Sequence, residues 1–225
     1  MSNFFINVKA KGAAGATKSL HGVSGAMKGV ARSALSVAAP LLGIAAVFKT
    51  ISGSIRVGKE FEQSMANLKA VTGATGKEFN NLKKMARDLG SSTKFTASEV
   101  AGLATEFGKL GFTSKEIQNV LKDTLMLAGA VGSDLSTAAS VAGSTLRGFG
   151  IDAKDTGRVT NVMASSFSKS ALDMSKFQES MKMMAPVAAA AGFEIEGTTA
   201  LLGSLANVGI HGSVAGTGLK NVFIK

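Results

Sequence analysis

The chain has 225 residues, which is enough for one large or two small domains with a substantial core. It contains 27 glycines and two prolines but no cysteine, and the missing cysteine excludes a disulfide framework and a thiolate metal site. The formal net charge is +10, and most of it lies in residues 1–59, which carry eight basic residues and no acidic one. Such a basic segment can bind an anionic membrane, nucleic acid or an acidic partner.

The first 59 residues are predicted to hold an irregular lead-in, residues 1–30, and a helix over residues 24–59. Residues 37–48 form an apolar run of 12 residues, shorter than the roughly 20 that span a bilayer. We favour a helix buried against protein, and the alternative is an interfacial or transiently inserted segment at residues 34–50. Specific nucleic-acid binding is not favoured, because the basic residues are spread out and lack an aromatic stacking platform.

From Glu60 onward, apolar residues recur at the three- and four-residue spacing of helices. Three Thr-x-x-Glu sequences precede such stripes, and each predicts a capping box in which threonine binds a free backbone amide and glutamate reaches back. They are Thr75–Glu78, Thr96–Glu99 and Thr113–Glu116. Gly90 is expected to end the helix that the first box opens.

The second half of the chain continues in the same way. Helices are expected from about Asp134 to Phe149, after Asp152, from Asp173 to near Gly192, over Leu201–Val208 and from Ser213 to Lys225. The short helix at Leu201–Val208 is assigned an apolar face of Leu201, Leu202, Leu205 and Val208. The last helix stops at Lys225 without a cap, which predicts a truncated or partial chain.

Four glycine corners punctuate these helices, each a glycine followed by a large apolar residue and a polar one. They are Gly111-Phe112-Thr113, Gly150-Ile151-Asp152, Gly192-Phe193-Glu194 and Gly209-Ile210-His211. Glycine reaches the left-handed conformation that ends a helix, the apolar residue folds back and the polar residue can cap the next helix. Spacings of 39, 42 and 17 residues predict a loose rhythm of helical hairpins without a fixed period. The predicted fold is all-α, a compact array of short to medium helices joined by tight glycine corners.

Catalytic chemistry is not predicted. His21 and His211 are the only histidines, and both are interpreted as solvated or capping residues. Ser166 and Lys169 match S-x-x-K, but the accompanying S-D-N and K-T-G sequences of that enzyme class are missing. We therefore expect no enzyme activity.

Cofactor and metal sites are not predicted either. The stretch Gly148–Ala153 matches G-x-G-x-x-A, but it follows a helix instead of a strand and is interpreted as a helix C-cap. Asp152 and Asp155 are interpreted as helix N-terminal residues. The methionines Met174, Met181, Met183 and Met184 are assigned to core filling in preference to an adaptable partner groove, since Phe177, Met181 and Met184 share a face.

Several stretches between residues 60 and 225 resemble the core region of phage tail tape measure proteins. They are Phe61–Gly73, Phe95–Ala101, Leu125–Leu135, Ala185–Ala188 with Gly192-Phe193, and Gly209–Leu219, which holds glycines at 209, 212 and 216 before Thr217. The resemblance covers about three-quarters of the chain. Proteins of this family are usually several times longer, which fits the uncapped helix at Lys225.

The resemblance implies a phage or prophage tail component that occupies the tail lumen, sets tail length and leaves ahead of the DNA. Implied partners are tail tube subunits, tail assembly chaperones, tail tip proteins and further copies of the chain. The expected domains are a basic segment, residues 1–59, and a helical core, residues 60–225, that is incomplete at its C-terminus. The second candidate function is a membrane-active helical protein that acts through residues 34–50.

Overall fold

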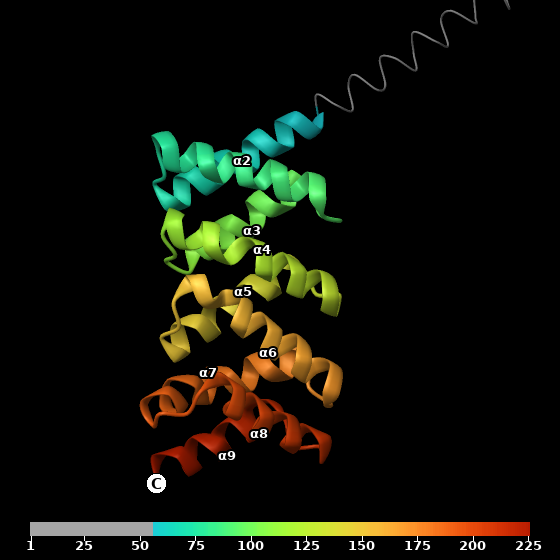
Figure 1. Ribbon diagram of the computed structural model, residues 1–225, viewed down its shortest axis with the longest axis vertical. Coiled ribbons are helices and arrows are strands. Elements are labelled where there is room, and N and C mark those ends of the chain that lie inside the picture. The colour runs from blue at the N-terminus through green and yellow to red at the C-terminus, as the bar shows by residue number, and fades with distance from the viewer. Residues whose placement is uncertain (1–55) are drawn as a thin grey trace, which may run out of the picture. The chain divides into compact units, whose positions relative to one another are not determined.

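The computed structural model describes residues 56–225, and in that range every regular element is helical (Figure 1). The all-α prediction is therefore confirmed. The helical residues 56–72 are followed by α2 (Gly76–Ser92), α3 (Ala97–Lys109), α4 (Ser114–Val131), α5 (Leu135–Phe149), the short 3₁₀ helix η1 (Ala153–Asp155), α6 (Thr156–Lys169), α7 (Met174–Ala190), α8 (Ile195–Asn207) and α9 (Gly212–Ile224). The predicted segment at residues 34–50 lies outside the described residues.

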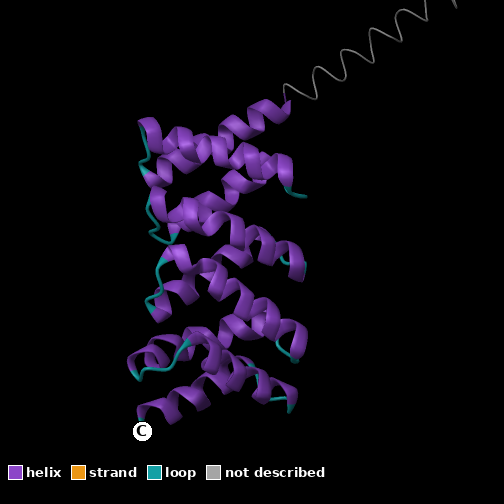
Figure 2. Cartoon of the chain, viewed as in Figure 1, coloured by secondary structure: helices purple, strands orange, loops and turns teal. Residues whose placement is uncertain are grey.

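Residues 58–225 form one unit in which the helices stack as successive hairpins. The even-numbered helices α2, α4, α6 and α8 contact one another in order, and the odd-numbered helices α3, α5, α7 and α9 do the same. The loops gather on two opposite sides of the stack (Figure 2). Because the main contacts join helices no more than two places apart, each hairpin buries its apolar surface against its immediate neighbours, as in repeat proteins.

The predicted glycine corners are all present. Gly111, Gly150, Gly192 and Gly209 have φ values of 79°, 64°, 80° and 85°, in the left-handed region. In each corner the amide of the following apolar residue donates to a carbonyl five residues earlier, the bond that defines a Schellman motif. The four bonds are Phe112 to Phe107 (3.1 Å), Ile151 to Leu146 (2.9 Å), Phe193 to Ala188 (2.9 Å) and Ile210 to Leu205 (2.9 Å).

The period of the corners is more regular than the sequence indicated. Gly111, Gly150 and Gly192 end the odd-numbered helices α3, α5 and α7, whereas Gly209 ends the even-numbered helix α8. The spacing of 17 residues therefore compares two different series, and within one series the corners recur after 39 and 42 residues. Another left-handed glycine, Gly132, ends α4.

Helix starts confirm two of the three predicted capping boxes. Thr96 with Glu99 and Thr113 with Glu116 form both reciprocal bonds. The prediction for Thr75 and Glu78 was wrong, since Thr75 precedes α2 but its side chain makes no capping bond. Gly76 opens that helix at φ 55°, a left-handed conformation that turns the first peptide away from the geometry of the other two boxes.

The prediction that Gly90 ends a helix was also wrong. α2 continues to Ser92, and Gly90 lies in its last turn. A Cβ atom at Gly90 would lie 2.5 Å from the backbone nitrogen of Ala97, the first residue of α3. Gly90 therefore permits the close approach of α3, and the helix ends beyond it.

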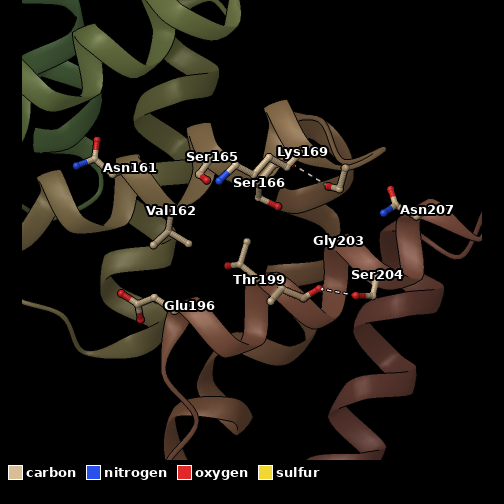
Figure 3. Close-up of a pocket in the computed structure, with 12 residues that line it drawn as sticks. Asn161, Val162, Ser165, Ser166, Lys169, Glu196, Thr199, Gly203, Ser204 and Asn207 are labelled. Carbon is tan, nitrogen blue, oxygen red and sulfur yellow. Dashed lines mark hydrogen bonds between the residues drawn. The ribbon is translucent and has the colours of Figure 1, made fainter.

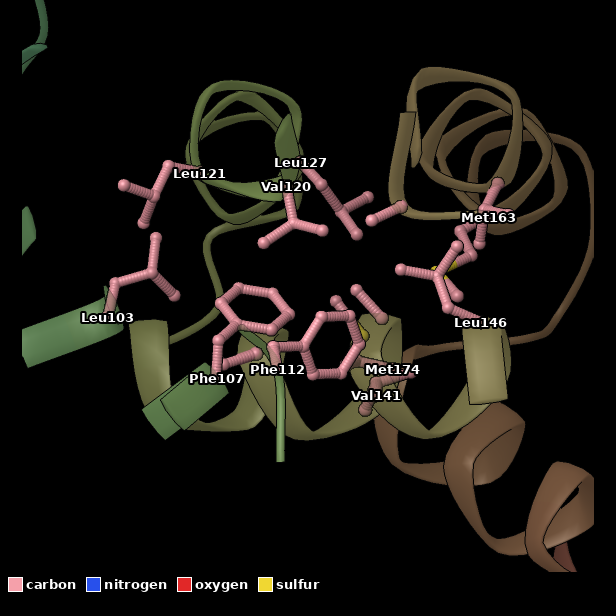
Figure 4. Packing of buried hydrophobic residues seen from close by; sticks show 14 of the residues in the cluster. Leu103, Phe107, Phe112, Val120, Leu121, Leu127, Val141, Leu146, Met163 and Met174 are labelled. Atoms are coloured by element: carbon pink, nitrogen blue, oxygen red, sulfur yellow. The ribbon is translucent and has the colours of Figure 1, made fainter. Parts of the chain in front are cut away.

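A continuous hydrophobic core runs through the stack, and Figure 4 shows its part between α3 and α7. Phe107 and Phe112 meet edge to face with ring centroids 5.2 Å apart, which ties the first corner to the core. The expected apolar face of α8 was partly wrong. Leu201 and Val208 are 42% and 72% exposed, and the buried positions are Ile195, Thr198, Thr199, Leu202, Gly203 and Ala206.

Glu116 joins its helix cap to the next hairpin. Its carboxylate accepts the Thr113 amide at 2.8 Å and pairs with Arg147 of α5 at 3.0 Å. The Arg147 guanidinium also lies 4.1 Å from the centroid of the Phe112 ring. The hydrogen bond from the Thr113 backbone N–H, with a smaller contribution from Arg147, holds the pKa of Glu116 below its ordinary value of 4.5.

Substituting Gly90→Ala is expected to lower the free energy of unfolding by about 1–3 kcal/mol, because the added methyl group clashes with the start of α3. Gly102→Ala is the matched control. No atom surrounds that helical position within 4 Å, so alanine is expected to stabilise α3 by about 0.5–1 kcal/mol. Denaturant unfolding of both variants measures the contrast, and a stabilised Gly90→Ala would contradict the close contact.

Substituting Glu116→Gln is expected to lower the free energy of unfolding by about 1 kcal/mol at pH 7. Since the pKa of Glu116 is lowered in the folded chain, its contribution is present above the ordinary value of 4.5 and is lost as the pH falls through the folded pKa. The difference between the variant and the original chain is therefore expected to shrink in acid. Glu78→Gln, in the box that does not form, is the control, and a difference that stays constant with pH would refute the mechanism.

Candidate functional site

A surface groove with a volume of about 510 Å³ lies between α6 and α8 (Figure 3). Both walls carry small and polar side chains, with a few apolar ones between them. The α6 wall consists of Asn161, Val162, Ser165, Ser166 and Lys169, continued by Ser170, and the α8 wall consists of Glu196, Thr199, Ala200, Gly203, Ser204 and Asn207. Two of these residues, Ser166 and Lys169, are those of the S-x-x-K match.

One end of the groove is closed by a direct contact between its walls. A Cβ atom at Gly203 would lie 3.2 Å from the Ser170 hydroxyl, so glycine lets α6 and α8 approach closely there. The side-chain oxygen of Asn207 accepts the Ala171 amide at 2.8 Å, which fixes the loop after α6 against α8.

At the other end of the groove, ion pairs connect α6 to the start of α8. Arg158 of α6 donates to Glu196 at 2.6 and 2.7 Å and to Glu194 at 2.9 Å. Its hydrogen bonds and charge hold the pKa of Glu196 below its ordinary value, and the same contacts raise the pKa of Arg158. Glu194 was predicted to cap α8, but its side chain makes no capping bond and pairs with Arg158 instead.

The floor of the groove contains a buried hydroxyl that has no partner among the described residues. Thr199 is 1% exposed, and Figure 3 shows its side chain directed from α8 toward the α6 wall. An unpaired buried hydroxyl is uncommon, since threonine in a helix usually bonds to a carbonyl of the preceding turn. The sequence offered no signal for this site beyond the small residues of α8.

Most of the residues that line the groove have polar side chains. His211 lies outside the groove as the exposed N-terminal flanking residue of α9. No cluster of three metal-ligating side chains occurs within residues 56–225. His21 falls outside the described range.

The other residues considered at the sequence level occupy structural positions. Gly150 is the C-cap of α5, and Asp152 accepts the Lys154 amide at 2.9 Å. Asp155 precedes α6 without a capping bond. Met181 and Met184 are buried with Phe177, whereas Met183 is 41% exposed.

None of the helices within the described range combines the length and the apolar character that crossing a bilayer requires. The segment at residues 34–50, which contains the apolar run, is outside that range, so its membrane interaction stays a prediction.

Substituting Thr199→Val is expected to leave the free energy of unfolding unchanged or to raise it by up to about 1 kcal/mol, because the variant removes a buried hydroxyl that has no hydrogen-bond partner. Thr145→Val is the matched control, since that buried hydroxyl donates to the Val141 carbonyl at 2.7 Å. The control is expected to lose about 1 kcal/mol in denaturant unfolding. Equal destabilisation of the two variants would show that the Thr199 hydroxyl is satisfied in solution.

The chain is similar to proteins of phage tails. Residues 83–225 match the family described as phage-related minor tail protein. The chain is 38% identical over 181 residues to the tape measure protein of Pneumococcus phage Dp-1, which covers 80% of the chain and 15% of that relative. It is 32% identical over 185 residues to the probable tape measure protein of Escherichia phage P2, which covers 80% of the chain and 23% of that relative.

The chain thus spans less than a quarter of the length of either of these curated relatives. No solved structure matches it. Because the family match covers well over half of the chain, the protein belongs to the phage-related minor tail protein family.

Proposed function

We propose that the chain acts in a phage or prophage tail as a tape measure protein, a structural component that sets tail length and leaves the tail ahead of the DNA. The observation that carries this proposal is the similarity to two tape measure proteins over 80% of the chain. Its place would be the lumen of the virion tail, after assembly in the bacterial cytoplasm. The role is structural and needs no catalytic residue or cofactor.

The proposed partners are tail tube subunits, tail assembly chaperones, tail tip proteins and further copies of the chain. The division into a basic segment, residues 1–59, and a helical core, residues 60–225, is part of the same proposal. Support comes from the charge, because residues 1–59 hold eight of the 25 basic residues and none of the 15 acidic ones.

Within this function, the helical stack acts as an assembly or docking domain and not as the ruler. Drawn out as one helix, residues 58–225 would reach about 250 Å at 1.5 Å per residue. The glycine corners instead reverse the chain after α3, α5, α7 and α8, and no helix from α2 to α9 exceeds 18 residues. This region therefore extends much less per residue than a continuous helix would.

The membrane-active alternative rests on residues 34–50 alone, and nothing in the described part of the chain favours it. Leakage of anionic liposomes by the full chain, abolished by deleting residues 34–50, would support that alternative.

Deleting residues 153–192, one hairpin of the stack, from a phage that encodes this chain is expected to abolish tail formation, because α8 and α9 lose the helices on which they pack. Electron microscopy of negatively stained lysates measures tail number and length. Tails shortened by about 60 Å, the length of a 40-residue helix, would show that this region is the ruler. Gly102→Ala, which preserves the stack, is expected to give tails of normal number and length.

A further inference from the structure

Two hydroxyl-bearing side chains point into the groove between α6 and α8 from its opposite walls (Figure 3). Thr199 of α8 is buried, and its hydroxyl has no hydrogen-bond partner within residues 56–225. The Ser166 hydroxyl of α6 makes no hydrogen bond in that range either, and its oxygen lies 3.6 Å from the Cβ position of Gly203, one turn after Thr199. Because an unpaired buried hydroxyl is unfavourable, a ligand that supplies an acceptor is favoured in this groove.

The uncompensated charge at the groove is positive. Lys169 lies one helical turn after Ser166 on the same wall, and its ammonium group forms no ion pair within the described residues. Glu196 is the only acidic residue that lines the groove, and Arg158 binds both of its carboxylate oxygens, at 2.6 and 2.7 Å. An ammonium group that lacks a counterion, close to two unpaired hydroxyls, favours the binding of an oxyanion.

The neighbouring groove between α4 and α6 has a volume of about 410 Å³ and lacks both features. Its buried threonine, Thr160, donates to the Thr156 carbonyl at 3.0 Å, so that hydroxyl has its acceptor within the helix. Lys122 and Asp123 both line this second groove, so its positive charge is balanced by a carboxylate. Of the two grooves, only the one between α6 and α8 combines an unpaired buried hydroxyl with an uncompensated cation.

The remaining lining limits the size and the polarity of the ligand. Val162, Ala200 and Gly203 present methyl groups and bare backbone between the polar residues. The volume of about 510 Å³ lies within the range of small-molecule sites, about 300–1,000 Å³. The groove therefore fits a short apolar chain that carries an oxyanion at one end. A single lysine balances one negative charge, which favours a carboxylate over a doubly charged phosphate.

We propose that the groove between α6 and α8 binds a carboxylate on a short apolar stem. The carboxylate accepts hydrogen bonds from Ser166, Thr199 and Lys169, for which its two oxygens offer enough lone pairs. The Thr199 hydroxyl reaches the ligand by rotation about χ1, since threonine in a helix has two favoured side-chain positions. The stem lies against Val162 and Ala200. This inference does not rest on the tape measure function, since it follows from the groove alone.

Titration of the full 225-residue chain with sodium hexanoate, followed by the chemical shifts of its amides in NMR spectra, measures the binding. Shift changes are expected at Ser166, Lys169 and Thr199 and not at Lys122, with a dissociation constant of about 1 mM for so short a ligand. Hexanol lacks the charge and inorganic phosphate lacks the stem, so each is expected to bind about tenfold more weakly or less. Hexanol that binds as tightly as hexanoate, or a groove whose shifts do not change, would overturn the proposal.

Thr199→Val is expected to weaken hexanoate binding about tenfold, because a hydrogen bond to a charged group is lost. The melting temperature of this variant without ligand is expected to be unchanged or slightly higher, which separates lost binding from lost folding. Thr199→Ser keeps the hydroxyl and is expected to restore most of the binding. A Thr199→Val variant that binds hexanoate like the unchanged chain is incompatible with the proposal.

Lys169→Gln is expected to weaken hexanoate binding about tenfold at low ionic strength, and added salt is expected to reduce the difference from the unchanged chain. Lys122→Gln, in the groove between α4 and α6, is the matched control and is expected to bind hexanoate normally. Equal weakening by the two substitutions would show that only the overall charge attracts the anion, which would overturn the site.

A blocked tripeptide with a central glutamate identifies the source of the carboxylate. If it changes the same amide shifts at least as tightly as hexanoate does, the site takes a carboxylate side chain of a polypeptide. Weaker binding of the tripeptide, with hexanoate still bound, assigns the site to a free organic acid.

Discussion

The left-handed glycine that ends each odd-numbered helix from α3 to α7 is the constraint on which the stack depends. It lets the chain turn within about three residues and at the same time satisfies a carbonyl of the last helical turn. The apolar residue that follows is carried back onto the helix it has just left, as Phe112 is onto Phe107. One local motif therefore ends a helix, contributes to the core and directs the next helix alongside.

Arginines from neighbouring helices fasten two of these corners to an adjacent hairpin. Arg147 of α5 covers the ring of Phe112 and pairs with Glu116, and Arg158 of α6 holds Glu194 and Glu196 beyond the third corner. Exposed ion pairs contribute about 0–1 kcal/mol each, so the burial of Phe112 at the first corner stabilises the fold more than they do. The arginines instead limit the directions in which successive hairpins can pack.

Local signals made most of this fold predictable, and non-local contacts explain the rest. The corners and the capping boxes at Thr96 and Thr113 depend on residues within one turn of each other, so the sequence identified them. The role of Gly90 was predicted wrongly because glycine is needed there for close contact with Ala97, the first residue of another helix. The buried face of α8 was predicted wrongly because packing on α6 decides which side of α8 is buried. The unpaired hydroxyl of Thr199 likewise depends on the separation of two helices, which no spacing along the chain encodes.

A stack of this kind gains little length for each residue that is added to it. Each repeat of about 40 residues adds one further layer of helices, about 10 Å, whereas the same residues in a continuous helix would add about 60 Å. Adding or removing a hairpin would therefore change the reach of this region by about one sixth of what a straight helix gives. Because of its left-handed glycine corners, the part of the chain from residue 58 to residue 225 extends far less than a continuous helix with the same number of residues.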